Sequence, residues 1–573
     1  MNSHCNVLAR TSHASFVAKI PLLPGKAGRA TAKDDASAKQ SNLLAKAEWL
    51  LGLLLTAIVV SLLVARTFHA GALWRDECAV VQLAQMPTVG DIAHNFQHEA
   101  FPPLFPLIVR GYITVFGSTD AALRLFGFCV GCLVVGAFWI SARLFGNNLP
   151  LLGLALLSLN TTFFVWGTTI RGYGLGSAMI VLVFGYVGSL LLRTRRRHII
   201  AAALVCIFAV QILLYNSVLL VAIGAAVLCI LLVERRSRQA IVVAAICTLA
   251  LVFLLPYTPA YLRARDWNIL VRGWPTSYSL WKHFEVALGN PGYSIPALWY
   301  AIAVGLIGLF TFRLYKNREA KPPSQLIWFG LLTSIFAIIG CYGFLRVLSY
   351  TTSAWYYLAF TCVIAAALDL IASVLCAANW LRVARLTVAT GALVLAPFAD
   401  WSAITECQTN VDVAASTVAA QAAPSDLIVV VPWQFGIPFN RYYRGSAPWI
   451  TIPSITDHRV HRYDLIKAKM ISTHPIDDLT EAIRTTLASR NRVWFVGGLN
   501  LPRPEEGPMI LPPAPASRFQ WDNRAYTASW WQQLSVFSVE HAVKVDAVPL
   551  SLPQSTRINE LEQTSLALVQ GWH

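Results

Sequence analysis

The sequence predicts a polytopic α-helical membrane protein that ends in a C-terminal soluble α/β domain. Of its 573 residues, 56% are hydrophobic and only 13% are charged, and the mean hydropathy is +0.56. Apolar runs of membrane-spanning length recur up to about residue 400, separated by short polar or basic segments. Beyond residue 401 the apolar runs shorten and alternate with polar residues. These observations exclude an ordinary soluble enzyme.

The net charge of +16 does not indicate nucleic-acid binding, because the basic residues recur in short loops between apolar runs. We therefore expect no nucleic-acid partner, and membrane lipids as the surroundings. Most of the 11 cysteines lie inside apolar runs, where cysteine acts as a small hydrophobic residue. They indicate no disulfide framework.

Three segments follow in order along the chain. Residues 1–45 are basic and lack apolar periodicity, so we expect a disordered cytoplasmic tail. Residues 46–400 form the transmembrane domain, with an extracytoplasmic loop at 67–121, and residues 401–573 form an extracytoplasmic α/β domain. We expect about eleven spans, near residues 48–66, 122–143, 149–167, 173–192, 199–215, 217–233, 240–257, 295–312, 325–345, 355–375 and 383–400.

Segment 103–117 decides the orientation of everything after it. It is short and contains Pro106 and Arg110, which suits a helix lying in the membrane interface rather than a span. With this assignment the clusters 193–197, 235–238 and 313–321 share the cytoplasmic side with the tail, as the positive-inside rule requires.

The C-terminal segment alternates helical and strand patterns. We expect helices at 411–423 and 477–489, strands at 427–431 and 493–496, and a pair of strands around 536–550. Aromatic and amide residues follow the first strand, at Pro432 to Phe435 and Asn440 to Tyr443. Such a group would either bind a sugar or dock the domain onto the membrane part.

Adjacent carboxylates follow the first apolar run, in the sequence Trp74-Arg75-Asp76-Glu77. A carboxylate just outside the membrane can take the proton from an acceptor hydroxyl as that oxygen attacks a sugar carbon. Asp76 is the candidate base. Neighbouring side chains point in different directions, so we expect Glu77 to orient the loop by hydrogen bonding or to pair with Arg75. Alternatively, the motif is an interface anchor followed by an ordinary helix start.

Further motifs in the same order resemble the GT-C glycosyltransferases, in the branch of protein O-mannosyltransferases and bacterial lipid A aminoarabinose transferases. The Asp-Glu pair is followed by a His/Pro-rich approach to the interfacial segment, by a Phe-Gly turn leading to an arginine, and later by an R-x-Y motif. The matching residues are Asp76-Glu77, His98 to Leu104, Phe116-Gly117 with Arg124, and Arg171-Gly172-Tyr173. The His98 match departs from the pattern, because three residues separate it from Pro102.

The resemblance implies transfer of a sugar from a polyprenyl- or dolichyl-phosphate donor to an acceptor hydroxyl, with inversion, on the extracytoplasmic face. Its motifs give Asp76 and Glu77 catalytic roles and place His98 and Tyr173 in the substrate site. Guanidinium groups suit the lipid phosphate of the donor. We expect the following arginines on the same face: Arg171 first, then Arg263, Arg265, Arg272 and Arg346. The acceptor could be a protein, a lipid or a glycan.

No metal site is assigned. His94 and His98, with Glu99 beside them, could hold a divalent cation, but histidines at a wet interface need no metal to explain them. Alternative functions are transport of a lipid or glycan and a noncatalytic role in envelope assembly. Ionisable residues concentrate at outer helix ends rather than within spans, with Asp369 the main exception, which disfavours a transporter.

Overall fold

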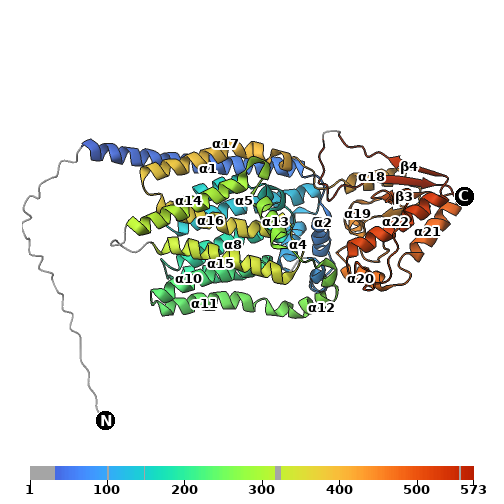
Figure 1. Cartoon of the computed structure of the whole chain (residues 1–573), viewed down its shortest axis with the longest axis horizontal. Helices are drawn as coiled ribbons and strands as arrows, with labels where there is room; N and C mark the ends of the chain where they lie inside the picture. The colour runs from blue at the N-terminus through green and yellow to red at the C-terminus, as the bar shows by residue number, and fades with distance from the viewer. Residues whose placement is uncertain (1–31, 100–101, 147–148, 317–323, 554–555) are drawn as a thin grey trace, which may run out of the picture. The chain divides into compact units, whose positions relative to one another are not determined.

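The computed structural model describes residues 32–99, 102–146, 149–316, 324–553 and 556–573 (Figure 1). Contacts within the chain define one unit up to Lys46 and a second unit from Ala47 onward. Helix α1 (Ala32–His69) belongs to both. The expected disordered tail lies largely outside the described residues, but residues 32–45 are helical. Ala, Lys and Gln are good helix formers, and they lead directly into an apolar helix.

Among the described residues, nine helices are long and apolar enough to cross a membrane. This confirms the polytopic α-helical class of the transmembrane part. The nine are α1, α5 (Asp120–Leu144), α8 (Gly172–Ser189), α10 (Asn216–Val233), α11 (Ser237–Val252) with its helical continuation to Val271, α14 (Ile295–Lys316), α15 (Gln325–Leu348), α16 (Leu358–Leu375) with the helical turn from Ala354, and α17 (Asn379–Ile404). Helix α8 is the centre of the bundle, packed against α5, α9 (Arg196–Ile212), α10 and α16.

Two expected spans differ from the prediction. Residues 149–167 form two short helices, α6 (Leu151–Ser158) and α7 (Thr161–Trp166), instead of one continuous span. The break falls at Asn160, whose side chain accepts the N–H of Phe163 at 2.9 Å and so starts a new helix. The span expected at 199–215 is α9, which has 17 residues. The expected number of about eleven is therefore reached only when α9 and the broken pair are counted.

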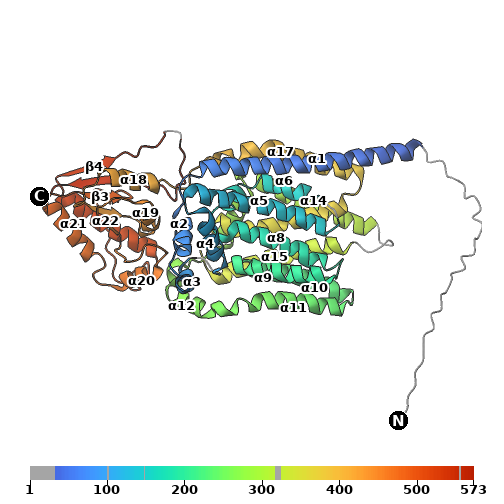
Figure 2. The same cartoon turned by 180° about the vertical axis from the view of Figure 1, so that it is seen from behind.

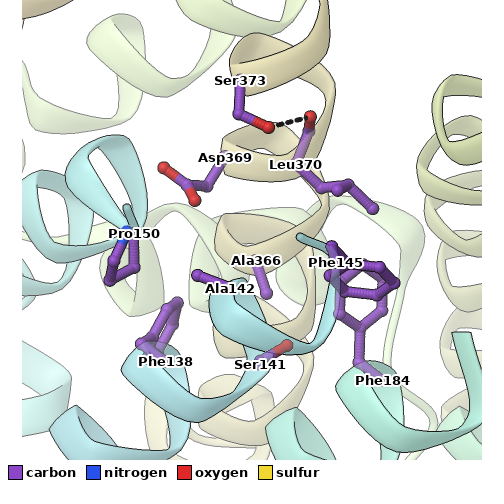
Figure 3. A pocket seen from close by; sticks show the side chains of 10 residues that line it. All are labelled: Phe138, Ser141, Ala142, Phe145, Pro150, Phe184, Ala366, Asp369, Leu370 and Ser373. Carbon is purple, nitrogen blue, oxygen red and sulfur yellow. Dashed lines mark hydrogen bonds between the residues drawn. The ribbon is translucent and has the colours of Figure 1, made fainter. Parts of the chain in front are cut away.

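The broken helix is held at its start by a carboxylate from α16. Asp369 is buried, and its Oδ1 accepts the N–H groups of Leu152 at 2.8 Å and Gly153 at 3.2 Å. Figure 3 shows this side chain turned toward Pro150, beside a small pocket between helices. The first N–H groups of a helix have no partner within the helix. Asp369, the ionisable residue predicted within a span, therefore caps the N-terminus of α6.

Shorter helices lie between the membrane bundle and the C-terminal domain, as Figure 2 shows for α2 and α4. Helix α4 has 13 residues, about 20 Å, which is too short to span a bilayer. Its Arg110 donates to the carbonyl groups of Ala84, Met86 and Pro87, which ties it to α2. These short helices are α2 (Arg75–Ala84), α3 (Val89–Asn95), α4 (Leu104–Phe116) and α12 (Thr258–Asn268). Helix α13 (Ser277–Leu288) packs against α7, α14 and α16 of the bundle.

The C-terminal domain is a five-stranded mixed sheet in the order β2-β1-β3-β5-β4. Strands β1, β2 and β3 are parallel, and β5 runs antiparallel to both β3 and β4. The strands are β1 (Leu427–Val430), β2 (Trp449–Thr451), β3 (Val493–Val496), β4 (Lys544–Val548) and β5 (Leu566–Gln570). The helices are α18 (Val411–Gln421), α19 (Gly436–Tyr442), α20 (Tyr463–Ile471), α21 (Asp477–Ala488) and α22 (Asn523–His541).

Helices cover both faces of this sheet. Ile428 and Val430 pack in one core with α18 and α19, and Leu427 and Val429 pack in another with α20, α21 and α22. The α/β class of this domain is confirmed. The strand pair expected around 536–550 was wrong: residues up to His541 belong to α22, and β4 pairs with β5 instead. Trp530 and Leu534, four residues apart, are both buried, and this spacing is typical of the helix α22.

We expect Asp369→Ala to destabilise the protein, because two N–H groups at the start of α6 would lose their acceptor inside the membrane. The cost should be about 1–3 kcal/mol. Asp369→Asn keeps a carbonyl oxygen in the same place and should unfold near the wild-type temperature. Thermal unfolding in detergent measures both, with Ser373→Ala, which removes only a bond to the carbonyl of Leu370 in its own helix, as the control. Equal destabilisation by Asn and Ala would contradict the capping role.

Candidate functional site

The start of α2 is fixed by the side chain of its third residue. Trp74 precedes the helix in an extended conformation, and the Oε2 atom of Glu77 accepts its backbone N–H at 3.2 Å. A carboxylate in this position satisfies an N–H group that the helix cannot pair and complements the helix dipole. Asp76 lies one residue earlier and therefore points elsewhere.

Glu77 is fully buried and joins three segments. Its Oε1 accepts from Arg124 of α5 and from the backbone N–H of Ile170, both at 2.8 Å. Arg124 also donates to the carbonyl groups of Gly71 and Ala72, which lead into α2. Glu77 thus orients the loop by hydrogen bonding, and its partner is Arg124 rather than Arg75. It positions both Asp76 and the residue after Ile170, which is Arg171.

The carboxylate of Asp76 is about one-fifth exposed and lies among two arginines and a histidine. Its Oδ1 is 3.6 Å from Nε of Arg75 and 3.6 Å from Nε2 of His461, and its Oδ2 is 3.9 Å from Nη2 of Arg171. These distances are longer than hydrogen bonds. The oxygens of Asp76 are therefore held by charge and are available to a hydroxyl donor.

Glu99 connects Arg171 and His461 from the other side. Its buried carboxylate accepts from Nη1 of Arg171 at 3.2 Å and from the backbone N–H of His461 at 2.5 Å. The same oxygen, Oε1, is 2.5 Å from Nδ1 of His461. His461 belongs to the C-terminal domain, so the site is built from both halves of the chain.

Opposing effects set the protonation of the acids here. Burial raises the pKa of Asp76, but Arg171, His461 and Arg75 outweigh it and hold that pKa below its usual value. Burial raises the pKa of Glu562 to about 7 although Arg75 lies 3.0 Å away and opposes the shift. Asp76 is therefore ionised at neutral pH, and Glu562 is the group that titrates there.

An aromatic cluster borders Arg171 on the membrane side. Trp74, Trp166 and Trp355 lie in mutual contact, with ring centroids 4.3–5.9 Å apart. Tyr173 packs against Tyr356 at 6.3 Å, at the start of α8. The turn before α8 passes very close to this helix, since a Cβ on Gly174 would lie 1.9 Å from the carbonyl oxygen of Gly167. Arg171 and Tyr173 are therefore rigidly placed.

The segment Asn440 to Tyr443 docks the C-terminal domain, one of its two expected roles. Arg441 donates to Asp120 at 2.7 Å and Tyr442 donates to the other oxygen of Asp120 at 2.8 Å. The hydroxyl of Tyr442 also accepts the N–H of Leu73 at 2.7 Å. These contacts hold α19 against α2 and α5, and they position His461 indirectly.

The other expected residues lie apart from Asp76. His98 stacks on Trp267 with ring centroids 4.8 Å apart, and burial lowers its pKa although Asp464 opposes the shift. Arg263 donates twice to Gln97, and Arg346 donates to the carbonyl of Pro275. Arg265 and Arg272 are exposed, the first on α12 and the second opposite Tyr350. Of the expected phosphate ligands, only Arg171 is beside Asp76.

The expected cation ligands are not grouped. His94 is exposed, His98 stacks on Trp267, and Glu99 faces His461 and Arg171. Within the part of the chain that the structure describes, no three His, Cys, Asp or Glu side chains are arranged to hold a metal ion.

His461, its partner Glu99 and Glu562 were not predicted as site residues from the sequence. A signal for His461 exists in residues 457–464, which contain two histidines, two arginines and two aspartates in eight positions. In the structure Arg459 and Arg462 pair with aspartates of this same run. These pairs order the loop and leave His461 facing the membrane domain.

Comparison with known proteins gives fold likeness at low sequence identity. No family model and no curated protein matches the sequence. Structures with a similar fold include ArnT from Cupriavidus metallidurans bound to undecaprenyl phosphate, at 13% identity and a TM-score of 0.46 over 78% of this chain and 92% of that chain. The apo state of the same protein has 14% identity and a TM-score of 0.37 over 79% and 93%. An oligosaccharyltransferase from Archaeoglobus fulgidus, tethered to an acceptor peptide, has 10% identity and a TM-score of 0.43 over 87% and 72%.

Glu77→Gln should destabilise the protein strongly, because it leaves buried Arg124 without its counter-ion. Breaking a buried pair in this way costs about 3–5 kcal/mol. The matched control is Glu285→Gln, which removes an exposed pair with Lys282 and should cost about 1 kcal/mol or less. Thermal or denaturant unfolding in detergent compares the two. Equal stability of both variants would show that Glu77 does not organise the site.

Proposed function

We propose that the protein transfers a sugar from a polyprenyl-phosphate-linked donor to an acceptor hydroxyl on the extracytoplasmic face, with inversion at the anomeric carbon. The observation that carries this proposal is the pairing of Asp76 with Arg171, 3.9 Å apart, at the ends of the membrane helices. A base that takes the acceptor proton and a cation that binds the leaving phosphate are the two groups that this reaction requires, and both must reach the same donor sugar.

Asp76 suits the role of general base. It is ionised at neutral pH because its pKa is held low, and it is partly exposed to an approaching hydroxyl. As the acceptor oxygen attacks the anomeric carbon, the hydroxyl proton passes to Asp76. The bond from that carbon to the phosphate oxygen breaks, and the lipid phosphate leaves with the electron pair.

Arg171 suits the phosphate. Its guanidinium is largely buried, fixed by Glu99 at 3.2 Å and by the carbonyl of Asp76 at 3.3 Å. A planar guanidinium can donate two parallel hydrogen bonds to a phosphate, and it strengthens them as charge develops on the leaving oxygen. The pairing with Glu99 keeps Arg171 in place before the donor arrives.

An apolar groove supports a donor carried on a lipid. It has a volume of about 420 Å³ and lies between α10, α11 and α15. Val218 of this groove also lines an inner pocket with Tyr215 and Tyr356, and Tyr356 contacts Tyr173. An isoprenoid chain lying in the groove would bring its phosphate past these tyrosines to Arg171. Buried apolar area along the chain would supply the binding energy.

The basic loops support the proposed orientation. Helix α8 begins beside Arg171 and ends at Ser189, shortly before Arg193. Helix α10 begins against the same end of α8, where Asn216 donates to the carbonyl of Gly176, and it ends just before Arg235. The arginine clusters are thus at the opposite ends of the helices from Asp76. Under the positive-inside rule Asp76 faces the extracytoplasmic side.

Asp76→Asn should reduce sugar transfer on the order of a hundredfold or more, because asparagine keeps the shape but cannot take a proton. The measurement is transfer from a polyprenyl-phosphate sugar by the purified full-length protein in detergent. Asp266→Asn, an exposed carboxylate on α12, is the matched control and should retain transfer. Near-normal transfer by folded Asp76→Asn would remove the general base and favour a transporter or a noncatalytic protein.

Arg171→Lys should raise KM for the donor roughly tenfold or more, since lysine keeps the charge but loses the paired donors to phosphate. Arg238→Lys, at an exposed position in the first turn of α11 and at the opposite ends of the helices, is the control for the same exchange. Steady-state kinetics with varied donor measure the effect. An unchanged KM in Arg171→Lys and also in Arg171→Ala would place the phosphate elsewhere.

A further inference from the structure

His461 is the one residue of the C-terminal domain whose side chain forms an ion pair with Asp76 in the described chain. Its Nε2 is 3.6 Å from Oδ1 of Asp76, and its side chain is about one-tenth exposed. Catalytic hydrogen bonds commonly shorten only when substrate binds, so this distance fits a working pair. The two residues come from different domains and are brought together only by docking.

The hydrogen bonds of His461 fix which ring nitrogen is free. Glu99 presents one oxygen, Oε1, to both the backbone N–H and Nδ1 of His461, each at 2.5 Å. An ionised carboxylate only accepts, so Nδ1 carries the hydrogen. In the neutral ring the lone pair is then on Nε2, the atom that faces Asp76. Arg171 holds Glu99 from its other oxygen, which keeps this geometry.

We propose that His461 positions Asp76 and receives through Nε2 the proton that Asp76 takes from the acceptor; this inference rests on the proposed sugar transfer. The acceptor hydroxyl gives its proton to Asp76 as the new bond to the sugar forms and the phosphate leaves. The proton then moves from the carboxyl group to Nε2, and Asp76 is again an ionised base. Glu99 stabilises the imidazolium, which finally releases the proton to water.

The groups around His461 favour this transfer. Carboxylates face it from two elements of the membrane part, and Tyr463 stacks beside it with ring centroids 6.0 Å apart. The titratable and charged groups that face it are Asp76 and Arg75 of α2, Glu99, Arg171 before α8, Tyr463 of α20 and Glu562. Acidic groups on both sides of the ring offset the charge of an imidazolium in this largely buried position.

His458 offers a matched control on the same loop. It is three residues before His461 and packs on Trp449 of β2 with ring centroids 4.4 Å apart. Burial lowers its pKa to about 4, so it stays neutral during the reaction. Exchange of His458 for glutamine therefore tests the effect of altering the loop without altering the proton path.

The experiment compares kcat, KM and the pH profile of kcat for wild type, Asp76→Asn, His461→Gln and His458→Gln, using the purified full-length protein in detergent. Glutamine keeps an N–H donor for Glu99 but cannot bind a proton. We expect His461→Gln to lower kcat on the order of a hundredfold, with little change in KM for donor or acceptor. The pH profile of kcat should change, because one proton-binding group beside Asp76 is removed, while Asp76 and Glu562 are present in both proteins. His458→Gln should keep the wild-type profile.

Each outcome decides one question. Transfer by Asp76→Asn at the wild-type rate would overturn the proposed function itself. Loss in Asp76→Asn with a wild-type kcat and pH profile in His461→Gln would leave sugar transfer standing and overturn the relay. A lower kcat with an unchanged profile would mean a purely structural role and would also overturn it. If His461→Gln unfolds, His461→Asn, whose shorter amide can also donate to Glu99, is measured per folded molecule against the same criteria.

Discussion

The buried pair of Glu77 and Arg124 is the contact on which the geometry of the site depends. One carboxylate group caps α2, neutralises an arginine of α5 and accepts the N–H of Ile170, one residue before Arg171. The direction of Asp76 and the position of Arg171 are therefore set by the same atoms. Each additional hydrogen bond to Glu77 restricts the movement of Asp76 relative to Arg171. Catalysis requires this restriction, because the reacting groups must be held in the right geometry.

Burying the Glu77–Arg124 pair costs free energy, and its benefit is the position that it gives to the neighbouring loops. Moving two charges out of water costs several kcal/mol for each ion, and the attraction between them only offsets that cost when every lone pair and N–H group is used. Here the Glu77 carboxylate has three donors and Arg124 has two backbone acceptors besides Glu77. An apolar pair of similar volume could pack as well, but it would not fix the loop before α2 to the loop before α8.

The sequence predicts much of this site and misses the rest for physical reasons. Asp76 is predicted because a carboxylate just outside the first span can act as a general base and matches the Asp-Glu motif. Arg171 is predicted because a guanidinium suits a lipid phosphate and the residue matches the R-x-Y motif on the same face. Asn160 shows a limit: hydropathy alone favours a continuous span, and a single capping side chain breaks it. The position of His461 beside Asp76 could not be predicted either. It depends on how the C-terminal domain docks, and no local sequence pattern specifies that docking.

The docking itself has the character of a permanent interface. Asp120 receives both Arg441 and Tyr442, Glu562 extends back to Arg75, and Glu99 is buried under His461. Removing the C-terminal domain would leave the Glu99 carboxylate without its histidine and Arg75 without its buried partner, so the charges around Asp76 would be rebalanced. Arg75 would then pair more closely with Asp76 and compete with Arg171 for it. Helix α17 continues to Ile404, past the expected boundary at residue 401, and the charged groups around Asp76 come from both sides of that boundary.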